Sequence, residues 1–138
     1  MRTNQIFNLT NCVRLMAIPL LICDDSNMAR KQVARSLPDN WDVEITFATN
    51  GVEGLAAIRE GKGEMVFLDL TMPEMDGYGV LENVFNEGLN AMIIVISGDI
   101  QPEARDRVMK FGAIDFIKKP VSKEKLEEVL AQYGLLET

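Results

Sequence analysis

Short apolar runs alternate along this chain with stretches in which apolar residues recur every three or four positions. Such runs are typical of strands buried on both faces, and the longer spacing is typical of helices with one buried face. The predicted strands are residues 20–23, 43–48, 65–68, 92–96 and 114–117. Because strands alternate with helices, the pattern predicts an α/β fold with one parallel five-stranded sheet covered by helices on both faces.

Apolar residues at helical spacing mark the helices between and after these strands. They are Ala29, Val33 and Leu37, then Leu55 and Ile58, then Ala104, Val108 and Phe111, and finally Leu126, Val129, Leu130 and Tyr133. Pro102 suits the first turn of a helix, and Gly112 suits the left-handed position just past its end. A further helix is expected over residues 78–85, with Asp76 as its cap and Gly77 permitting a tight turn into it.

The composition fits one globular domain with a net negative charge. The chain has 138 residues, of which 47% are apolar, and a formal charge of -7. It has no long run of Lys or Arg to neutralise phosphates, so direct nucleic-acid binding is not expected. It also has no His, and Cys12 and Cys23 are not in CxxC spacing, so the ligands of a common zinc site are missing. Free thiols in a reducing compartment are expected.

The N-terminal region contains an apolar run, residues 15–23, that follows Arg2 and Arg14. The run is too short to span a bilayer, and two aspartates stand where a signal peptide would be cleaved. We therefore interpret it as part of the first core strand and expect a cytoplasmic protein without membrane insertion. Residues 16–138 are predicted to form the domain. Residues 1–15 are predicted to be an extension, either an arm or an artefact of cloning or of start-site assignment.

Polar residues follow the predicted strands at the ends that share one edge of a parallel sheet. Asp24 and Asp25 close the first strand, Asp69 closes the third, Ser97 follows the fourth, and Lys119 comes just after the fifth. In open α/β sheets, ligands bind outside the carboxyl ends of the strands. These five residues are therefore expected to converge on one site.

The chemistry of these side chains suits a divalent cation and a phosphoryl group. Neighbouring carboxylates repel each other unless a cation lies between them, and ligands that are all oxygens favour Mg²⁺ or Mn²⁺ over zinc. Magnesium commonly keeps positions for waters and a phosphate. The Lys119 ammonium and the Ser97 hydroxyl suit the oxygens of a phosphoryl group in transfer, with Asp69 as the nucleophile.

Each of these residues, taken alone, has a plainer interpretation. Asp25 or Ser26 can cap the helix that follows the first strand. Ser97 before a glycine is commonly a turn residue, and Lys119 before a proline is commonly a surface-loop residue. The functional interpretation is stronger because the whole set falls at one edge of the predicted sheet.

Four segments of the chain resemble the receiver domain of two-component response regulators, and the nearest pattern is the chemotaxis-type single-domain receiver. The segments are LLICDDS at residues 20–26, MVFLDLTMPEMDG at 65–77, IVISG at 94–98 and FIKKP at 116–120. They occur in the family's order and spacing over residues 19–134. The resemblance implies a flavodoxin-like doubly wound (βα)5 fold with strand order 2-1-3-4-5.

The resemblance also implies a role for each matching residue. Asp69 would be the phosphoacceptor, with Lys119 paired to the phosphoryl oxygens and Ser97 hydrogen-bonded to one of them. The implied magnesium ligands are the carboxylates of Asp25 and Asp69, the Thr71 backbone carbonyl, and Asp24 mainly through a coordinated water. Phe116 would be the switch residue, acting through ring packing alone because Phe has no hydroxyl. Thr71 and Asp99 would modulate the phosphoryl lifetime.

The implied partners are proteins. The phosphoryl donor would be a sensor histidine kinase or a histidine phosphotransfer protein, since a chain without His cannot be its own phosphohistidine donor. The downstream target would bind the face from Pro102 to Tyr133. Positive residues there either select an acidic partner or form a solvated face; they are Arg105, Arg107, Lys110, Lys123 and Lys125. The chain would catalyse only its own phosphorylation and dephosphorylation.

Two other classes of protein share part of this pattern. An aspartate-nucleophile phosphatase of the haloacid dehalogenase type would need a second Asp two residues after the nucleophile, where this chain has Thr71. A degenerate receiver, which binds a partner without being phosphorylated, would be expected to lack an acidic residue or the lysine of the site. All of these residues are present in the sequence.

Overall fold

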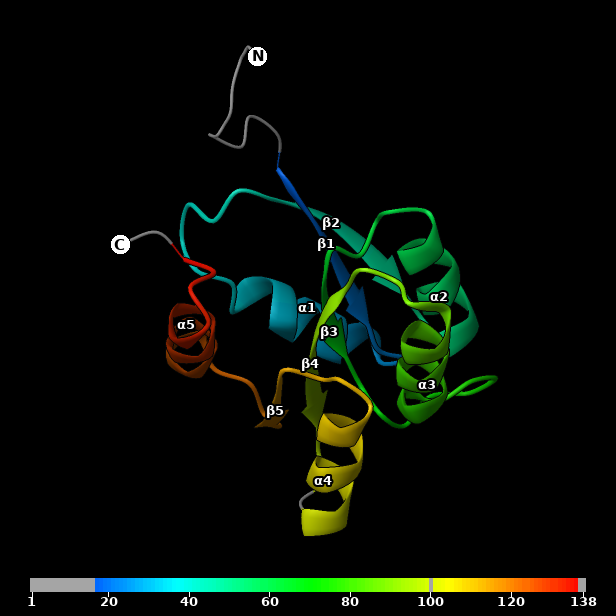
Figure 1. Ribbon diagram of the computed structural model, residues 1–138. Helices are drawn as coiled ribbons and strands as arrows, with labels where there is room; N and C mark the ends of the chain where they lie inside the picture. The colour runs from blue at the N-terminus through cyan, green and yellow to red at the C-terminus, as the bar shows by residue number, and fades with distance from the viewer. Residues whose placement is uncertain (1–16, 100, 137–138) are drawn as a thin grey trace.

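Five parallel strands form one sheet in the order β2-β1-β3-β4-β5, which confirms the predicted fold class (Figure 1). The computed structural model describes residues 17–99 and 101–136. The strands are β1 Ile18–Cys23, β2 Val43–Ala48, β3 Met65–Leu68, β4 Met92–Ser97 and β5 Asp115–Lys118. The helices are α1 Asn27–Arg35, α2 Gly51–Arg59, α3 Gly77–Glu87, α4 Pro102–Lys110 and α5 Lys123–Gln132.

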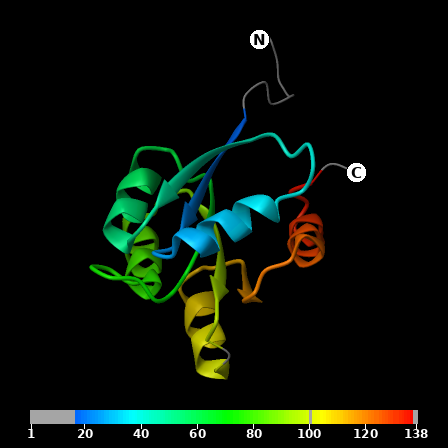
Figure 2. The ribbon, with the colours of Figure 1, turned by 180° about the vertical axis from the view of Figure 1, so that it is seen from behind.

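Helices cover both faces of the sheet. Because successive side chains of a strand point to opposite faces, each buried strand contributes residues to two hydrophobic clusters, one on each face. In β1, Leu20 and Ile22 join the cluster under α1 and α5, while Leu21 and Cys23 join the cluster under α2, α3 and α4. Figures 1 and 2 show α1 and α5 on one side of the sheet and α2 and α3 on the other. Because β1, β3 and β4 are buried on both faces, their sequences are almost continuously apolar.

Side-chain caps define where four of the helices begin. Ser26, Asn50, Asp76 and Ser122 each accept a hydrogen bond from the backbone N–H three residues further on. Ser26 is thus the cap of α1, which leaves the neighbouring Asp25 carboxylate available for other contacts. The predicted roles of Asp76 as a cap and of Gly112 at a positive φ after α4 are confirmed.

The strand and helix boundaries differ slightly from those expected. β1 begins at Ile18 rather than at residue 20, because the N–H of Ile18 donates to Asp42 O of the segment before β2, while pairing with β3 starts only at Leu20. Pro19, which has no N–H, is tolerated where the strand has a neighbour on one side only. β4 includes Ser97, β5 is shifted by one residue, and α3 extends from Gly77 to Glu87.

The predicted extension over residues 1–15 lies outside the described residues, as does Cys12. Within residues 17–99 and 101–136, no helix has the length and apolar character needed to cross a membrane.

Leu126→Ala is expected to lower the free energy of unfolding by about 2–5 kcal/mol, because it leaves a cavity between α5 and the sheet. Leu126 is fully buried, whereas Gln132 on the same helix is exposed. Urea unfolding followed by circular dichroism measures the change. Gln132→Ala is the matched control and should change the free energy by less than about 0.5 kcal/mol. Equal effects of the two substitutions would contradict this account of the α5 contact.

Candidate functional site

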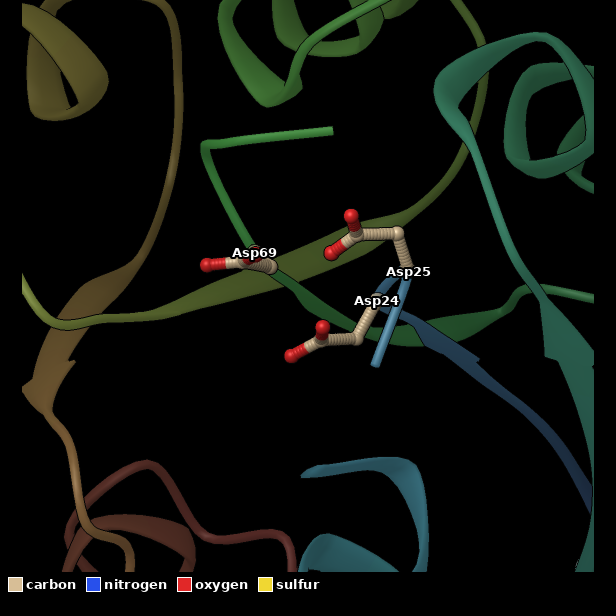
Figure 3. A group of neighbouring side chains, drawn as sticks. All are labelled: Asp24, Asp25 and Asp69. Carbon is tan, nitrogen blue, oxygen red and sulfur yellow. The ribbon is translucent and has the colours of Figure 1, made fainter. Parts of the chain in front are cut away.

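Three carboxylates lie together at the carboxyl edge of the sheet. Asp24 and Asp25 follow β1, Asp69 follows the adjacent β3, and each offers an oxygen within 4.8 Å of the other two (Figure 3). Backbone bonds continue the sheet to this point, since Asp24 N donates to Ala48 O and Asp69 N donates to Cys23 O, both at 3.0 Å. Asp24 and Asp69 are buried, while Asp25 is exposed.

Lys119 bridges the two buried carboxylates. Its Nζ lies 2.9 Å from Asp24 Oδ2 and 3.4 Å from Asp69 Oδ1. Its backbone N–H donates to Ser97 O at 2.8 Å, so the β4–β5 pairing carries Lys119 to the site; the following peptide bond, to Pro120, is cis. Lys119 rather than the exposed Lys118 therefore contacts the carboxylates.

The charges of the site are not balanced. Burial and the nearby charge of Asp24 raise the pKa of Asp69, while Lys119 opposes the shift. Burial disfavours the charged form of Lys119, but its hydrogen bond to Asp24 and the charges of Asp69 and Asp24 outweigh burial and raise its pKa. One ammonium thus compensates the charges of two buried carboxylates, and the Asp25 carboxylate lies beside them. An all-oxygen, negatively charged donor set of this kind fits Mg²⁺ or Mn²⁺.

Asp24 is held in place from three directions. Its Oδ1 accepts from Ser26 N at 2.9 Å, its Oδ2 accepts from Lys119, and its backbone carbonyl accepts from Arg30 Nη1 at 2.7 Å. The contact with Arg30 was not anticipated from the sequence, because nothing in the pattern distinguishes this arginine from other charged residues on the surface of a helix.

Ser97 and Asp99 form one connected turn between β4 and α4. Ser97 is buried, and its Oγ accepts from Asp99 N at 3.1 Å. The Asp99 carboxylate accepts from Gln101 N at 2.9 Å, next to the start of α4. A change in the position of the Ser97 hydroxyl is thereby linked to the start of α4 through two hydrogen bonds.

The two remaining predicted site residues belong to the strands that flank β4, since Thr71 follows β3 and Phe116 lies on β5. Thr71 is exposed, two residues after Asp69. Phe116 is half-buried on β5 and packs against the cluster under α2, α3 and α4. Its ring is therefore positioned to pack against that face of the sheet rather than against α1 and α5.

The face from Pro102 to Tyr133 carries less unpaired positive charge than the sequence suggested. Three of the cations form ion pairs: Arg105 Nη1 lies 3.8 Å from Asp115 Oδ1, Lys123 Nζ lies 2.7 Å from Asp39 Oδ2, and Lys125 Nζ lies 3.1 Å from Glu128 Oε1. Arg107 lies 4.0 Å above the centre of the Tyr78 ring. These contacts favour the solvated-face interpretation for most of the cations on this face.

The loop after Asp69 depends on a glycine that lets two backbone segments approach closely. Gly77 N donates to Leu70 O at 2.9 Å, and a Cβ at Gly77 would lie 2.3 Å from Asp69 O. Because a backbone carbonyl cannot move aside as a flexible side chain can, a side chain at position 77 must displace the segment that carries Asp69.

Fold and site together define a doubly wound α/β protein with an acidic, lysine-bridged centre at the carboxyl edge of its sheet. Residues 20–131 match the family model for the response regulator receiver domain. The chain therefore belongs to the response regulator receiver family and has a signalling role in phosphorelays, which confirms the resemblance inferred from the sequence.

Relatives and solved structures agree with this assignment. The chain is 34% identical to the chemotaxis protein CheY of Listeria monocytogenes over 113 residues, which cover 82% of this chain and 95% of that protein. It is 38% identical over 114 residues, 82% of its length, to protein-glutamate methylesterase/protein-glutamine glutaminase 3 of Geobacter sulfurreducens. The CheX-CheY-BeF3-Mg complex of Borrelia burgdorferi matches with a TM-score of 0.76 and 30% identity, covering 86% of this chain and 90% of that one.

The matched region is only part of several relatives. The chain spans 30% of the Geobacter protein, 39% of a probable C4-dicarboxylate response regulator of Priestia megaterium and 33% of a methylesterase of Nitratidesulfovibrio vulgaris. The similarity to these proteins therefore concerns the receiver domain alone.

Gly77→Ala is expected to lower the free energy of unfolding by about 1–3 kcal/mol, because the new Cβ meets the Asp69 carbonyl. This loss of stability should exceed the stabilisation expected at the start of α3 from the higher helix propensity of Ala. Gly98→Ala is the matched control, since a Cβ there has no atom within 4 Å. Chemical denaturation of both variants tests the contact, and equal stabilities would show that the backbone can adjust without cost.

Asp69→Asn is expected to raise the free energy of unfolding in metal-free buffer near neutral pH. A pKa above its ordinary value means that folding disfavours the ionised carboxylate, so a neutral side chain removes that cost. Asp106→Asn, on the exposed surface of α4, is the control and should have little effect. A loss of stability in Asp69→Asn would mean that the ion pair with Lys119 outweighs burial and repulsion.

Proposed function

We propose that Asp69 accepts a phosphoryl group from a partner protein's phosphohistidine or from a small acyl phosphate. The observation that carries this proposal is the position of the Asp69 carboxylate. It is buried, its Oδ1 lies 3.4 Å from Lys119 Nζ, and two further carboxylates lie beside it. A nucleophile, a fixed cation and an oxygen-rich donor set at one sheet edge are the groups that phosphoryl transfer requires.

The magnesium ion, or manganese in its place, would be held by the carboxylates of Asp25 and Asp69, the backbone carbonyl of Thr71, and Asp24 mainly through water. When bound, the ion would neutralise charge on the phosphoryl oxygens. The exposed carboxylate of Asp25 can turn toward the ion, while Asp24 keeps its bond to Lys119. The Borrelia burgdorferi complex, with 30% identity, contains both Mg²⁺ and BeF3, which supports a magnesium ion as the metal.

In the transfer step, an oxygen of Asp69 attacks phosphorus as the bond to the donor breaks. Lys119 balances charge on a phosphoryl oxygen, and the Ser97 hydroxyl donates to another. Lys119 reaches this position from its bridge between the two buried carboxylates. Phosphorylation would replace the single negative charge of the Asp69 carboxylate with a phosphoryl group of about -1.5 to -2 charges, which extends further from the sheet edge and draws both side chains toward it.

The signal would pass from the site to a protein-binding surface. Ser97 is linked through Asp99 to the start of α4, and Phe116 on the neighbouring β5 is the expected aromatic switch. The downstream target would bind the face from Pro102 to Tyr133. Thr71 and Asp99 would set the phosphoryl lifetime through water access. The chain would act in the cytoplasm with a sensor histidine kinase or a histidine phosphotransfer protein and would catalyse only its own phosphorylation and dephosphorylation.

Incubation with acetyl phosphate and Mg²⁺ is expected to add the mass of one phosphoryl group to the chain, as measured by intact-mass spectrometry. The gain should disappear in Asp69→Asn and in the presence of a chelator, because both the nucleophile and the metal are needed. Asp106→Asn, which removes an exposed carboxylate of α4 that is not part of the acidic cluster, should behave like the wild type.

If the wild type shows no gain in mass, beryllofluoride binding distinguishes rapid hydrolysis of the phosphorylated Asp69 from an inability to be phosphorylated. Beryllofluoride mimics the phosphoryl group without being hydrolysed, so a rapidly dephosphorylated receiver would still bind it in the presence of Mg²⁺. A wild-type protein that neither gains mass nor binds beryllofluoride would instead be a degenerate receiver that binds its partner independently of phosphorylation.

A further inference from the structure

The Arg30 side chain on α1 reaches back to the turn that carries two residues of the acidic cluster Asp24, Asp25 and Asp69. Its Nη1 donates to the Asp24 backbone carbonyl at 2.7 Å, and its Nη2 donates to Asn27 Oδ1 at 3.2 Å. The Asp24 carbonyl belongs to the peptide bond that joins Asp24 to Asp25. Arg30 is therefore hydrogen-bonded to the backbone of the cluster.

This hydrogen bond completes the restraints on Asp24. The Asp24 N–H donates to Ala48 O at 3.0 Å, and Asp24 Oδ1 accepts from Ser26 N at 2.9 Å. The contact with Arg30 fixes the remaining backbone group of Asp24, its carbonyl. Because a peptide bond is planar, it also fixes the plane of the bond that leads to Asp25.

The Asp25 carboxylate depends on this backbone for its direction. Among residues 17–99 and 101–136, no hydrogen bond or ion pair restrains the exposed Asp25 carboxylate, whereas Asp24 and Asp69 are buried and contact Lys119. An oxygen of Asp25 nevertheless lies within 4.8 Å of oxygens of both other carboxylates. The peptide plane before Asp25 helps to set the direction of its Cα–Cβ bond, so Arg30 influences where this carboxylate points.

The charge of Arg30 does not account for its place beside the cluster. A guanidinium close to a metal site repels a divalent cation, so electrostatics alone would make Arg30 unfavourable for Mg²⁺ binding. Both hydrogen bonds of its guanidinium named above go to uncharged acceptors, a backbone carbonyl and an amide oxygen. The positional and the electrostatic effects of Arg30 on metal binding therefore have opposite signs, and an experiment can separate them.

We propose that Arg30 is a positioning residue for the metal site, which directs the Asp25 carboxylate toward Mg²⁺ by holding the Asp24 carbonyl. The proposal rests on the proposed function and extends it to a residue outside the set of metal ligands. Loss of a hydrogen bond that orients a metal ligand commonly lowers metal affinity by about 10–100-fold. Loss of Arg30 thus weakens Mg²⁺ binding even though it removes a repelling charge.

Arg30→Met is expected to raise the dissociation constant for Mg²⁺ about tenfold, because Met keeps an unbranched side chain but cannot donate a hydrogen bond. The constant is measured from the amide NMR shifts of Asp25, Asp69 and Thr71 during a Mg²⁺ titration without any phosphoryl donor. Lys31→Met is the matched control, since it removes one exposed positive charge from the same helix and should leave the affinity equal or slightly higher. An affinity of Arg30→Met equal to or above that of the wild type would overturn the proposal.

A merely structural role of Arg30 predicts a different result. Arg30→Met would then unfold at a lower urea concentration, yet its folded form would bind Mg²⁺ with wild-type affinity, which would also overturn the proposal. The NMR titration follows signals of the folded protein, so a lower stability does not change the expected constant. Arg30→Gln, which has a shorter and uncharged side chain, is a second variant and should weaken Mg²⁺ binding in the same direction.

The outcomes distinguish a failure of this proposal from a failure of the proposed function. If the wild type shows no Mg²⁺-dependent shifts at the acidic cluster, the metal site is refuted, and the role of Arg30 is refuted with it. If the wild type binds Mg²⁺ and Arg30→Met binds it equally well, only the role of Arg30 is refuted, and the proposed phosphorylation of Asp69 is unaffected.

Discussion

The structure depends on how mutually repelling carboxylates are held together at the end of a buried sheet. Asp24 and Asp69 follow adjacent strands, and each is held by a backbone hydrogen bond that continues the sheet. The backbone of neither residue can move away from the other without breaking that pairing. Lys119 is the compensating charge, and it comes from the other end of the sequence because β5 places it at the same edge. One ammonium does not neutralise the three carboxylates, so the cluster keeps a net negative charge, which suits a metal ion.

The rigidity of the centre comes from the core beneath it. Leu20, Leu21, Val66, Leu68 and Ile94 are almost inaccessible to solvent, so the strands that carry the site are packed from both faces. Side chains at the ends of such strands are positioned more accurately than side chains on free loops. The connecting turns are different, since the one after β4 is held by the local hydrogen bonds of Ser97 and Asp99. The fold thus combines an acidic cluster fixed by the sheet with a turn that is held only by local hydrogen bonds.

Much of the fold and of the candidate site could be predicted from the sequence. The strands and their order were predictable because parallel strands buried on both faces require apolar runs, and the motifs around Asp69 and Lys119 are specific. Boundaries were less predictable, because the start of β1 at Ile18 depends on which neighbour each residue pairs with. The contact between Arg30 and the Asp24 carbonyl was missed, since it depends on a side-chain direction that no spacing records.

By itself, the sequence determined which side chains stand at the strand ends, and hence the family and the acidic character of the site. Only the tertiary structure decided how far apart those side chains lie and how their charges are compensated. It placed the Lys119 ammonium between Asp24 and Asp69, assigned the α1 cap to Ser26 rather than Asp25, and opened an apolar cavity next to the lysine. The reason is physical: residue types and spacing follow from local backbone periodicity, whereas distances, burial and cavities arise from contacts between segments far apart in the chain.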